Sequence, residues 1–219
     1  MIKGIIVNDN GLIASMIETL HNDQILAFVK AELLVIGVVI ITMVMNAAMK
    51  RRNFSVHSPV NCAVMVFVSA LMVSVGGMSL WTIKGIIFAL ILLYASVQDV
   101  STHQVDDFIW IMICILALVG FEIFNLREMI LCGLVVFVPQ VAISCMSKNG
   151  GIGGADIKIS TASAILIGSL GGVMGYMLGI IIAIITRMIY CKTKGYSLSE
   201  PFALMPFLSM GLVIGYFFS

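Results

Sequence analysis

The hydrophobic positions of this chain fall into long, nearly continuous runs that short polar segments separate. A helix that crosses the hydrocarbon core of a bilayer needs about 20 mainly apolar residues, within a range of about 17–25. The runs predict such helices at Leu33–Met49, Pro59–Ser79, Gly85–Gln98, Phe108–Phe124, Met129–Met146, Asp156–Leu170, Gly172–Tyr190 and Phe202–Phe218. The pattern therefore predicts an all-α fold, a polytopic membrane helical bundle of about eight transmembrane helices, with a range of six to eight.

The first 30 residues have a more mixed character. The stretch from Leu12 to Val29 contains both apolar and polar residues and is compatible with an amphipathic helix on the membrane surface. We therefore predict an extracytoplasmic or interfacial segment over residues 1–30. A membrane-embedded domain over residues 31–219 follows it.

Composition supports a membrane location. Hydrophobic residues make up 61% of the chain and charged residues 11%, whereas a soluble domain carries about 25% charged residues. A net charge of +1 gives no reason to expect nucleic acid. The five cysteines have no CxxC or metal-ligand spacing and the three histidines are scattered, so neither a metal nor another cofactor is expected.

The basic residues predict an orientation. With eight spans, the eight basic residues on one side are Lys50, Arg51, Arg52, Lys148, Lys158, Arg187, Lys192 and Lys194. The four on the other side are Lys3, Lys30, Lys84 and Arg127. Since cytoplasmic loops carry the excess of lysine and arginine, the first side is expected to be cytoplasmic.

Two carboxylates lie at the ends of apolar runs on either side of a predicted hairpin. Asp99 ends one run, and Asp156 begins another after the glycine-rich segment Gly150–Gly154. The two runs between them are joined by the short turn Asn125–Glu128. Two spans return the chain to its starting side, so both carboxylates are expected at the cytoplasmic face. An ionisable group beside lipid is costly and suggests a functional site by default.

Such a pair can perform acid–base chemistry. Two carboxylates held close together do not both ionise easily, so they share a proton. The ionised member can take a proton from water while the protonated member donates to a carbonyl oxygen, so that water attacks a peptide bond. Glycines before Asp156 let backbone approach an extended substrate. Asp156 also lies near a helix N-terminus, which favours it as the ionised partner.

Simpler interpretations stand beside this one. A carboxylate at a helix end, such as Asp99, is often a solvated cap, and Asp106 and Asp107 fit a polar loop. Lys158 fits a lysine whose charged end reaches the membrane interface. Overlapping GxxxG spacings favour close helix packing, and their glycines are Gly168, Gly171, Gly172, Gly175 and Gly179.

The segment Gly153-Gly154-Ala155-Asp156-Ile157-Lys158 resembles the GxGD-x-K motif of the type IV prepilin peptidases, a family of GxGD intramembrane aspartyl proteases. The stretch from Ala95 to Asp107 is similar to that family's first aspartate segment. The resemblance extends over roughly Leu33 to Phe218 and implies that Asp99 and Asp156 are the catalytic residues.

The same resemblance makes Gly153, Gly154, Ala155 and Lys158 motif or substrate-binding residues. Ala155 stands where the motif has its second glycine. A positive φ at this position would be strained for alanine.

The resemblance implies an aspartic endopeptidase of the bacterial cytoplasmic (inner) membrane, with its active site facing the cytoplasm. Its substrates would be prepilins or pseudopilins of type IV pilus and protein secretion systems, whose short basic leader is cut just before an apolar helix. The implied partners are this substrate and the lipid bilayer, and a homo-oligomer is compatible with them. The interval Lys50–Ser58 leaves no room for the cytoplasmic CxxC domain of longer members. Methylation of the new N-terminus, which is associated with that domain, is therefore not implied.

Two other classes of function use the same residues. In a small ion-coupled transporter, Asp99 and Asp156 would carry protons or cations. Carriers usually place such groups near the membrane midplane, whereas these carboxylates lie at helix ends. In a pilus or secretion assembly subunit, catalysis would have been lost, and the retention of both aspartates argues against this.

Overall fold

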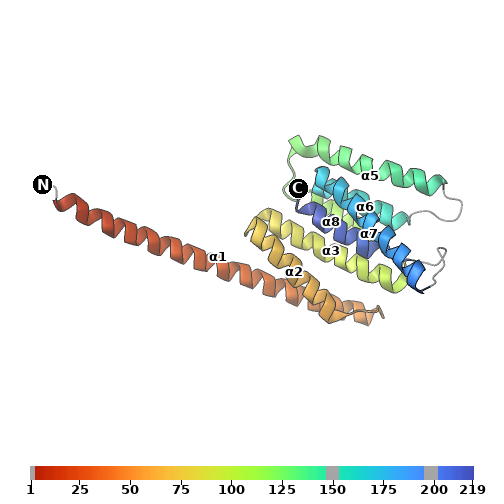
Figure 1. Ribbon diagram of the computed structural model, residues 1–219, viewed down its shortest axis with the longest axis horizontal. Coiled ribbons are helices and arrows are strands. Elements are labelled where there is room, and N and C mark those ends of the chain that lie inside the picture. The colour runs from red at the N-terminus through yellow and green to blue at the C-terminus, as the bar shows by residue number, and fades with distance from the viewer. Residues whose placement is uncertain (1–2, 147–152, 195–201) are drawn as a thin grey trace.

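The computed structural model describes residues 3–146, 153–194 and 202–219. Within these ranges the chain forms eight α-helices, one short 3-10 helix and no strand (Figure 1). The α-helices are α1 Lys3–Arg51, α2 Ser58–Gly76, α3 Leu80–Thr102, α4 Phe108–Ala117, α5 Leu126–Met146, α6 Gly154–Ile167, α7 Leu170–Lys194 and α8 Met205–Tyr216. The 3-10 helix η1, Ile123–Asn125, precedes α5. The predicted all-α bundle is confirmed.

Five helical segments in the described ranges are long and apolar enough to cross a membrane. They are Ile25–Arg51, Ser58–Gly76, Leu80–Thr102, Ile123–Met146 and Leu170–Thr193. The helices α4, α6 and α8 have 10, 14 and 12 residues, which corresponds to roughly 15–21 Å at 1.5 Å per residue. They are shorter than the apolar runs that predicted them. For α6 the reason is local, because Gly168 adopts a left-handed conformation (φ 63°) that ends the helix.

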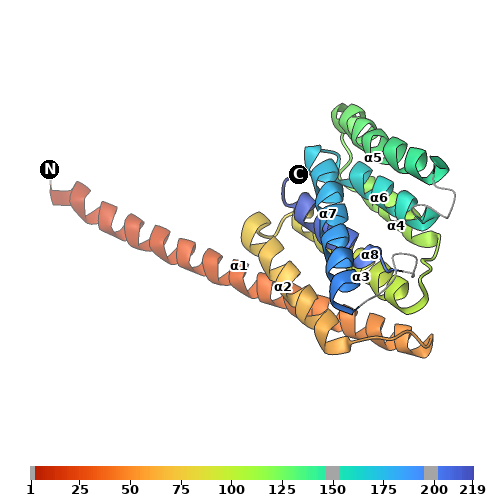
Figure 2. The ribbon, with the colours of Figure 1, turned by 45° about the vertical axis from the view of Figure 1, so that its right-hand side comes forward.

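The first helix, α1, runs without a break from Lys3 to Arg51. It therefore covers both the predicted amphipathic stretch and the first predicted span, and it continues across residue 30. Figures 1 and 2 show its N-terminal part projecting away from the bundle, while its C-terminal part packs against α2. A buried polar pair joins these two helices, in which Asn61 Nδ2 donates to Asn46 Oδ1 at 2.8 Å.

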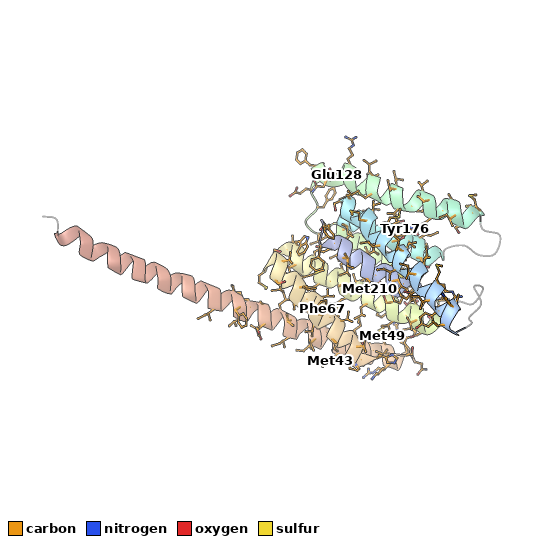
Figure 3. The ribbon with its side chains drawn as sticks, viewed as in Figure 1. Met43, Met49, Phe67, Glu128, Tyr176 and Met210 are labelled. Atoms are coloured by element: carbon orange, nitrogen blue, oxygen red, sulfur yellow. The ribbon has the colours of Figure 1, made fainter. Side chains whose placement is uncertain are left out.

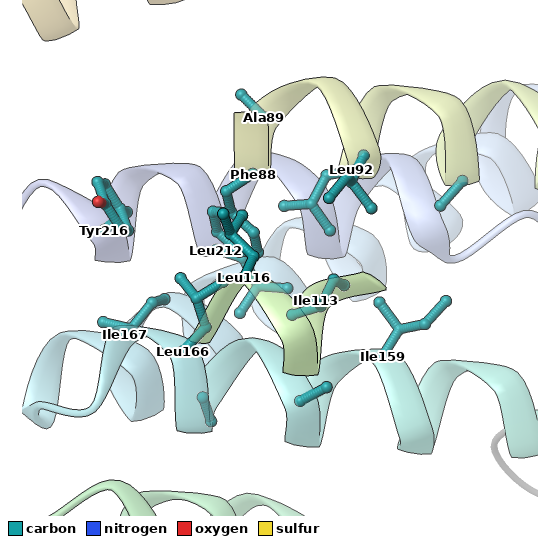
Figure 4. Close-up of a cluster of buried hydrophobic side chains, with 14 of the residues drawn as sticks. Phe88, Ala89, Leu92, Ile113, Leu116, Ile159, Leu166, Ile167, Leu212 and Tyr216 are labelled. Carbon is teal, nitrogen blue, oxygen red and sulfur yellow. The ribbon is translucent and has the colours of Figure 1, made fainter. Parts of the chain in front are cut away.

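The centre of the bundle is built from α3, α4, α6 and α8. Figure 4 shows its apolar cluster, to which Phe88, Ile113, Ile159 and Leu212 contribute one side chain from each of these helices. In the part of the chain that the structure describes, α3 and α6 do not pack directly on each other. Both α4 and α8 contact each of them, so these two short helices set the distance between α3 and α6.

Glycines bring α7 and α8 unusually close together. A Cβ atom added at Gly175 would lie 2.7 Å from the carbonyl oxygen of Gly211, and one added at Gly179 would lie 2.8 Å from Leu208 Cα. Backbone therefore packs on backbone at this contact. The helix-packing interpretation of the GxxxG spacings is confirmed for these positions.

Candidate active site

Asp99 lies in the last turns of α3 and is buried, with 8% of its surface exposed. The backbone N–H of His103, which adopts a left-handed conformation, donates to the Asp99 carbonyl oxygen and ends the helix. The Asp99 side chain points at the start of α8, where the N–H of Met205 donates to Oδ2 at 2.9 Å. This donor stabilises an ionised carboxylate, and it is available because the first N–H groups of a helix have no partner within it.

Asp156 lies in the first turn of α6. Its carboxylate lies against Gly153, since a Cβ added at that glycine would be 3.0 Å from Asp156 Oδ2. Gly153 has φ −58° and Ala155 is helical, so neither position requires a positive φ. Alanine therefore replaces the second motif glycine without backbone strain. The preceding residues Gly150–Ile152 lie outside the described ranges.

The two carboxylates lie at the same end of the bundle. The segment from α4 to α5 returns the chain to the end where α3 finishes, and α6 starts there (Figure 1). The charge on Asp99 acts on the Asp156 carboxyl group, and the charge on Asp156 acts in turn on the hydroxyl group of Tyr176 in α7. The two aspartates thus interact electrostatically although their helices do not touch.

Two buried side chains form hydrogen bonds that lead to the backbone of Asp156. Ser160, one turn further along α6, donates to the Asp156 carbonyl oxygen at 2.7 Å. Gln140 of α5 donates from Nε2 to Ser160 Oγ at 2.8 Å, and both side chains are fully buried. The sequence analysis did not single out Gln140. The available signal was that it is the only amide in the apolar run Met129–Met146.

Lys158 is paired with the loop that follows Asp99. Its Nζ lies 2.6 Å from Asp107 Oδ1, and the neighbouring Asp106 lies 4.0 Å from Arg52. The N–H of Asp106 also donates to Gln98 Oε1 at 3.2 Å. These contacts are partly exposed, so each ion pair contributes little stability. Together they tie the loop after α3 to the basic end of α1 and to α6, which agrees with the loop interpretation of Asp106 and Asp107.

The described part of the chain contains no group of three His, Cys, Asp or Glu side chains that could hold a metal ion. Two carboxyl groups, those of Asp99 and Asp156, lie at this end. A helical bundle with membrane-length helices and two carboxyl groups at one end defines the class as a polytopic membrane protein with a two-carboxylate site.

Comparison with known families makes the assignment more specific. The model of the type IV leader peptidase family matches residues 86–191, a region that runs from α3 into α7 and contains Asp99, Asp156 and Lys158. The matched segment is similar to the type IV leader peptidase family, in agreement with the resemblance drawn from two short motifs. No curated protein and no solved structure matched the chain.

Proposed function

We propose that this protein is a membrane aspartic endopeptidase that removes the short basic leader of type IV prepilins or pseudopilins. The observation that carries the proposal is the placement of Asp99, in the last turns of α3, and Asp156, in the first turn of α6, at the same end of the bundle, both inside the segment that matches the leader peptidase family. Residues 31–219 would form the membrane-embedded peptidase domain, and residues 1–30 would lie outside it.

The surroundings of the pair suggest a role for each carboxylate. Asp99 receives the backbone N–H of Met205 at the start of α8, which stabilises its ionised form and makes it the base. Asp156 is then the proton donor. This reverses the assignment expected from the sequence, where a helix N-terminus was evident only for Asp156.

The reaction would proceed in two balanced steps. Asp99 takes a proton from water, the water oxygen bonds to the carbonyl carbon, and Asp156 protonates the carbonyl oxygen. In the second step the resulting diol collapses, so that the C–N bond breaks. The leaving nitrogen then takes the proton held by Asp99, and one diol hydroxyl returns a proton to Asp156. Both carboxyl groups are thereby restored without a covalent intermediate.

Basic residues suggest that this end faces the cytoplasm. Those described at or near the Asp99 end are Lys50, Arg51, Arg52, Lys158, Arg187 and Lys192. Lys84 and Arg127 lie towards the opposite end, at the start of α3 and of α5. By the positive-inside rule, the carboxylates would meet a leader peptide on the cytoplasmic side of the bacterial inner membrane.

The test is cleavage of a prepilin-like precursor in membranes that contain the wild type, Asp99→Asn or Asp156→Asn. Each substitution should lower the cleavage rate by about 10²–10⁴-fold, because it removes one proton-transferring group. In Asp99→Asn the asparagine keeps an oxygen that can accept the Met205 N–H, so the amount of this folded variant should not change. The control is Glu122→Gln, an exposed carboxylate beyond α4 at the other end. Wild-type rates in either aspartate variant would refute the proposed pair.

A further inference from the structure

A large apolar groove runs along the bundle beside the candidate active site. It has a volume of about 910 Å³, near the upper end of the roughly 300–1,000 Å³ found for ligand pockets. Its floor is α3, and its walls are α2 and α8. In the described part of the chain α2 and α8 each pack against α3 but not against each other, which leaves the space between them open. Figure 3 labels one side chain from each wall, Phe67 on α2 and Met210 on α8.

One end of this groove lies beside Asp99. Its floor includes Ser96 and Val100, which lie on either side of Asp99 along α3. Its α8 wall begins at Pro206, directly after Met205, the residue whose N–H binds the Asp99 carboxylate. A chain that has its scissile bond at the carboxylates can therefore continue into the groove.

The polarity of the lining changes along the groove. All five polar lining residues belong to the end near Asp99, and they are Ser55, His57, Asn61, Ser96 and Ser209. Away from that end the lining is wholly apolar and includes Leu71 of α2, Ala89 of α3 and Phe217, which directly follows α8. An occupant that matches this lining is polar at the scissile bond and apolar beyond it.

The length and the surroundings of the groove define the conformation of its occupant. The lining extends along α2 from His57, the residue before this helix, to Leu71, and along α8 from Pro206 to Phe217, the residue after this helix. These lengths are roughly 17–21 Å at 1.5 Å per residue. This corresponds to about 11–14 helical residues. A backbone segment surrounded by lipid and apolar side chains must satisfy its N–H and C=O groups internally, which requires a helix.

We propose that this groove binds the apolar helix that adjoins the cleavage site of the substrate. The inference rests on the proposed function and extends it, because it assigns to α2, α3 and α8 a binding surface that is separate from the carboxylates. The helix lies between α2 and α8 and presents the peptide bond at its end to Asp99 and Asp156.

The test uses a pair of substitutions on α2. Val64 lines the groove, whereas Val66 does not, and the two side chains are 44% and 38% exposed. Val64→Trp fills the groove and Val66→Trp adds the same bulk outside it. Each variant is assayed with a full precursor and with a short peptide that contains the leader and the cleavage site but lacks the apolar segment.

Val64→Trp should raise KM for the full precursor by about tenfold, or ~1.4 kcal/mol, and should leave KM for the short peptide unchanged. Val66→Trp should change neither value. An equal KM increase for both substrates, or equal effects of the two variants on the precursor, would overturn the groove assignment. If the wild type cleaves neither substrate, the proposed function itself is wrong.

A second measurement does not depend on cleavage. A photo-crosslinking amino acid at position 64, in the Asp156→Asn background, should form an adduct with the apolar segment of the precursor. The same group at position 66 should not. An adduct at position 64 that contains only lipid or a second copy of this chain would refute the assignment.

Discussion

The carboxylate of Asp156 lies over the backbone of the residue that caps its helix. Gly153 is needed there for space rather than for a special backbone conformation, because its φ of −58° is open to any residue. Ala155 does not need a special backbone conformation either, because it is helical. Among the motif positions described, the requirement for a small residue is therefore strongest at position 153, where a side chain would press on the candidate catalytic group.

Gly153→Ala should lower kcat for leader cleavage by about tenfold, because its Cβ would lie 3.0 Å from Asp156 Oδ2 and 3.7 Å from Cγ, and small displacements of a reacting group are costly. Gly154→Ala provides the comparison, since a Cβ added there meets nothing within 4 Å. Its loss of kcat should be clearly smaller. Kinetics of both variants on one precursor check this, and a larger loss at position 154 would contradict it.

The titration of the pair provides a second check at this scale. The proposed mechanism needs one protonated and one ionised carboxyl group, so the rate should fall at low pH, where both are protonated, and at high pH, where both are ionised. The expected profile of kcat against pH is bell-shaped, and its two limits belong to the pair rather than to either residue. A rate that keeps rising across the carboxyl range would argue against shared protonation.

At the scale of the elements, the contact between α7 and α8 holds the start of α8 in place. Because α8 provides the Met205 N–H that binds Asp99, the position of this helix affects the base as well as the bundle. The glycine faces let the two helices approach until backbone meets backbone. A methyl group at this contact would have to separate them.

Gly175→Ala should destabilise the protein by about 1–3 kcal/mol, the typical cost of overpacking, since its Cβ would lie 2.7 Å from the Gly211 oxygen and 3.0 Å from Gly215 Cα. Gly37→Ala in α1 is the matched control, because a Cβ there meets nothing within 4 Å. Thermal unfolding in detergent measures both. Equal melting temperatures for the two variants would show that this contact tolerates separation.

At the scale of the whole molecule, one end of the bundle contains most of the described basic residues, the carboxylate pair and the polar end of the groove. The other end contains η1 and the chain terminus after α8. From this asymmetry we expect the Asp99 end to face the cytoplasm. One accessible position at each end of the bundle is enough to test this orientation.

Cys145 lies in the last turn of α5, at the end where α6 begins, and is exposed. In a variant that keeps only this cysteine, a membrane-impermeant maleimide should label it in inverted vesicles and not in intact cells. Phe124→Cys at the opposite end, where the side chain is 95% exposed, should show the reverse. Labelling of both positions from one side would contradict the topology, whatever the cleavage assays show.

Much of the fold could be predicted because membrane helices are local features. An apolar run of sufficient length specifies a helix with little help from the rest of the chain, and the predicted runs correspond to α1 through α8. The ends of the short helices were less predictable. The sequence analysis interpreted Gly168 as a helix-packing residue and extended the run to Leu170, although glycine is also the residue that most often ends a helix, as it does here with a left-handed conformation.

The sequence by itself determined the all-α class, the approximate helices, both motif segments and the hairpin that returns Asp156 to the end where Asp99 lies. Each of these depends on residues that are close together along the chain. The tertiary structure decided that Asp99 receives the start of α8, that Gln140 supports α6, and that α2 and α8 leave a groove over α3. These features join residues that are far apart in sequence, and they depend on how closely side chains allow whole helices to approach.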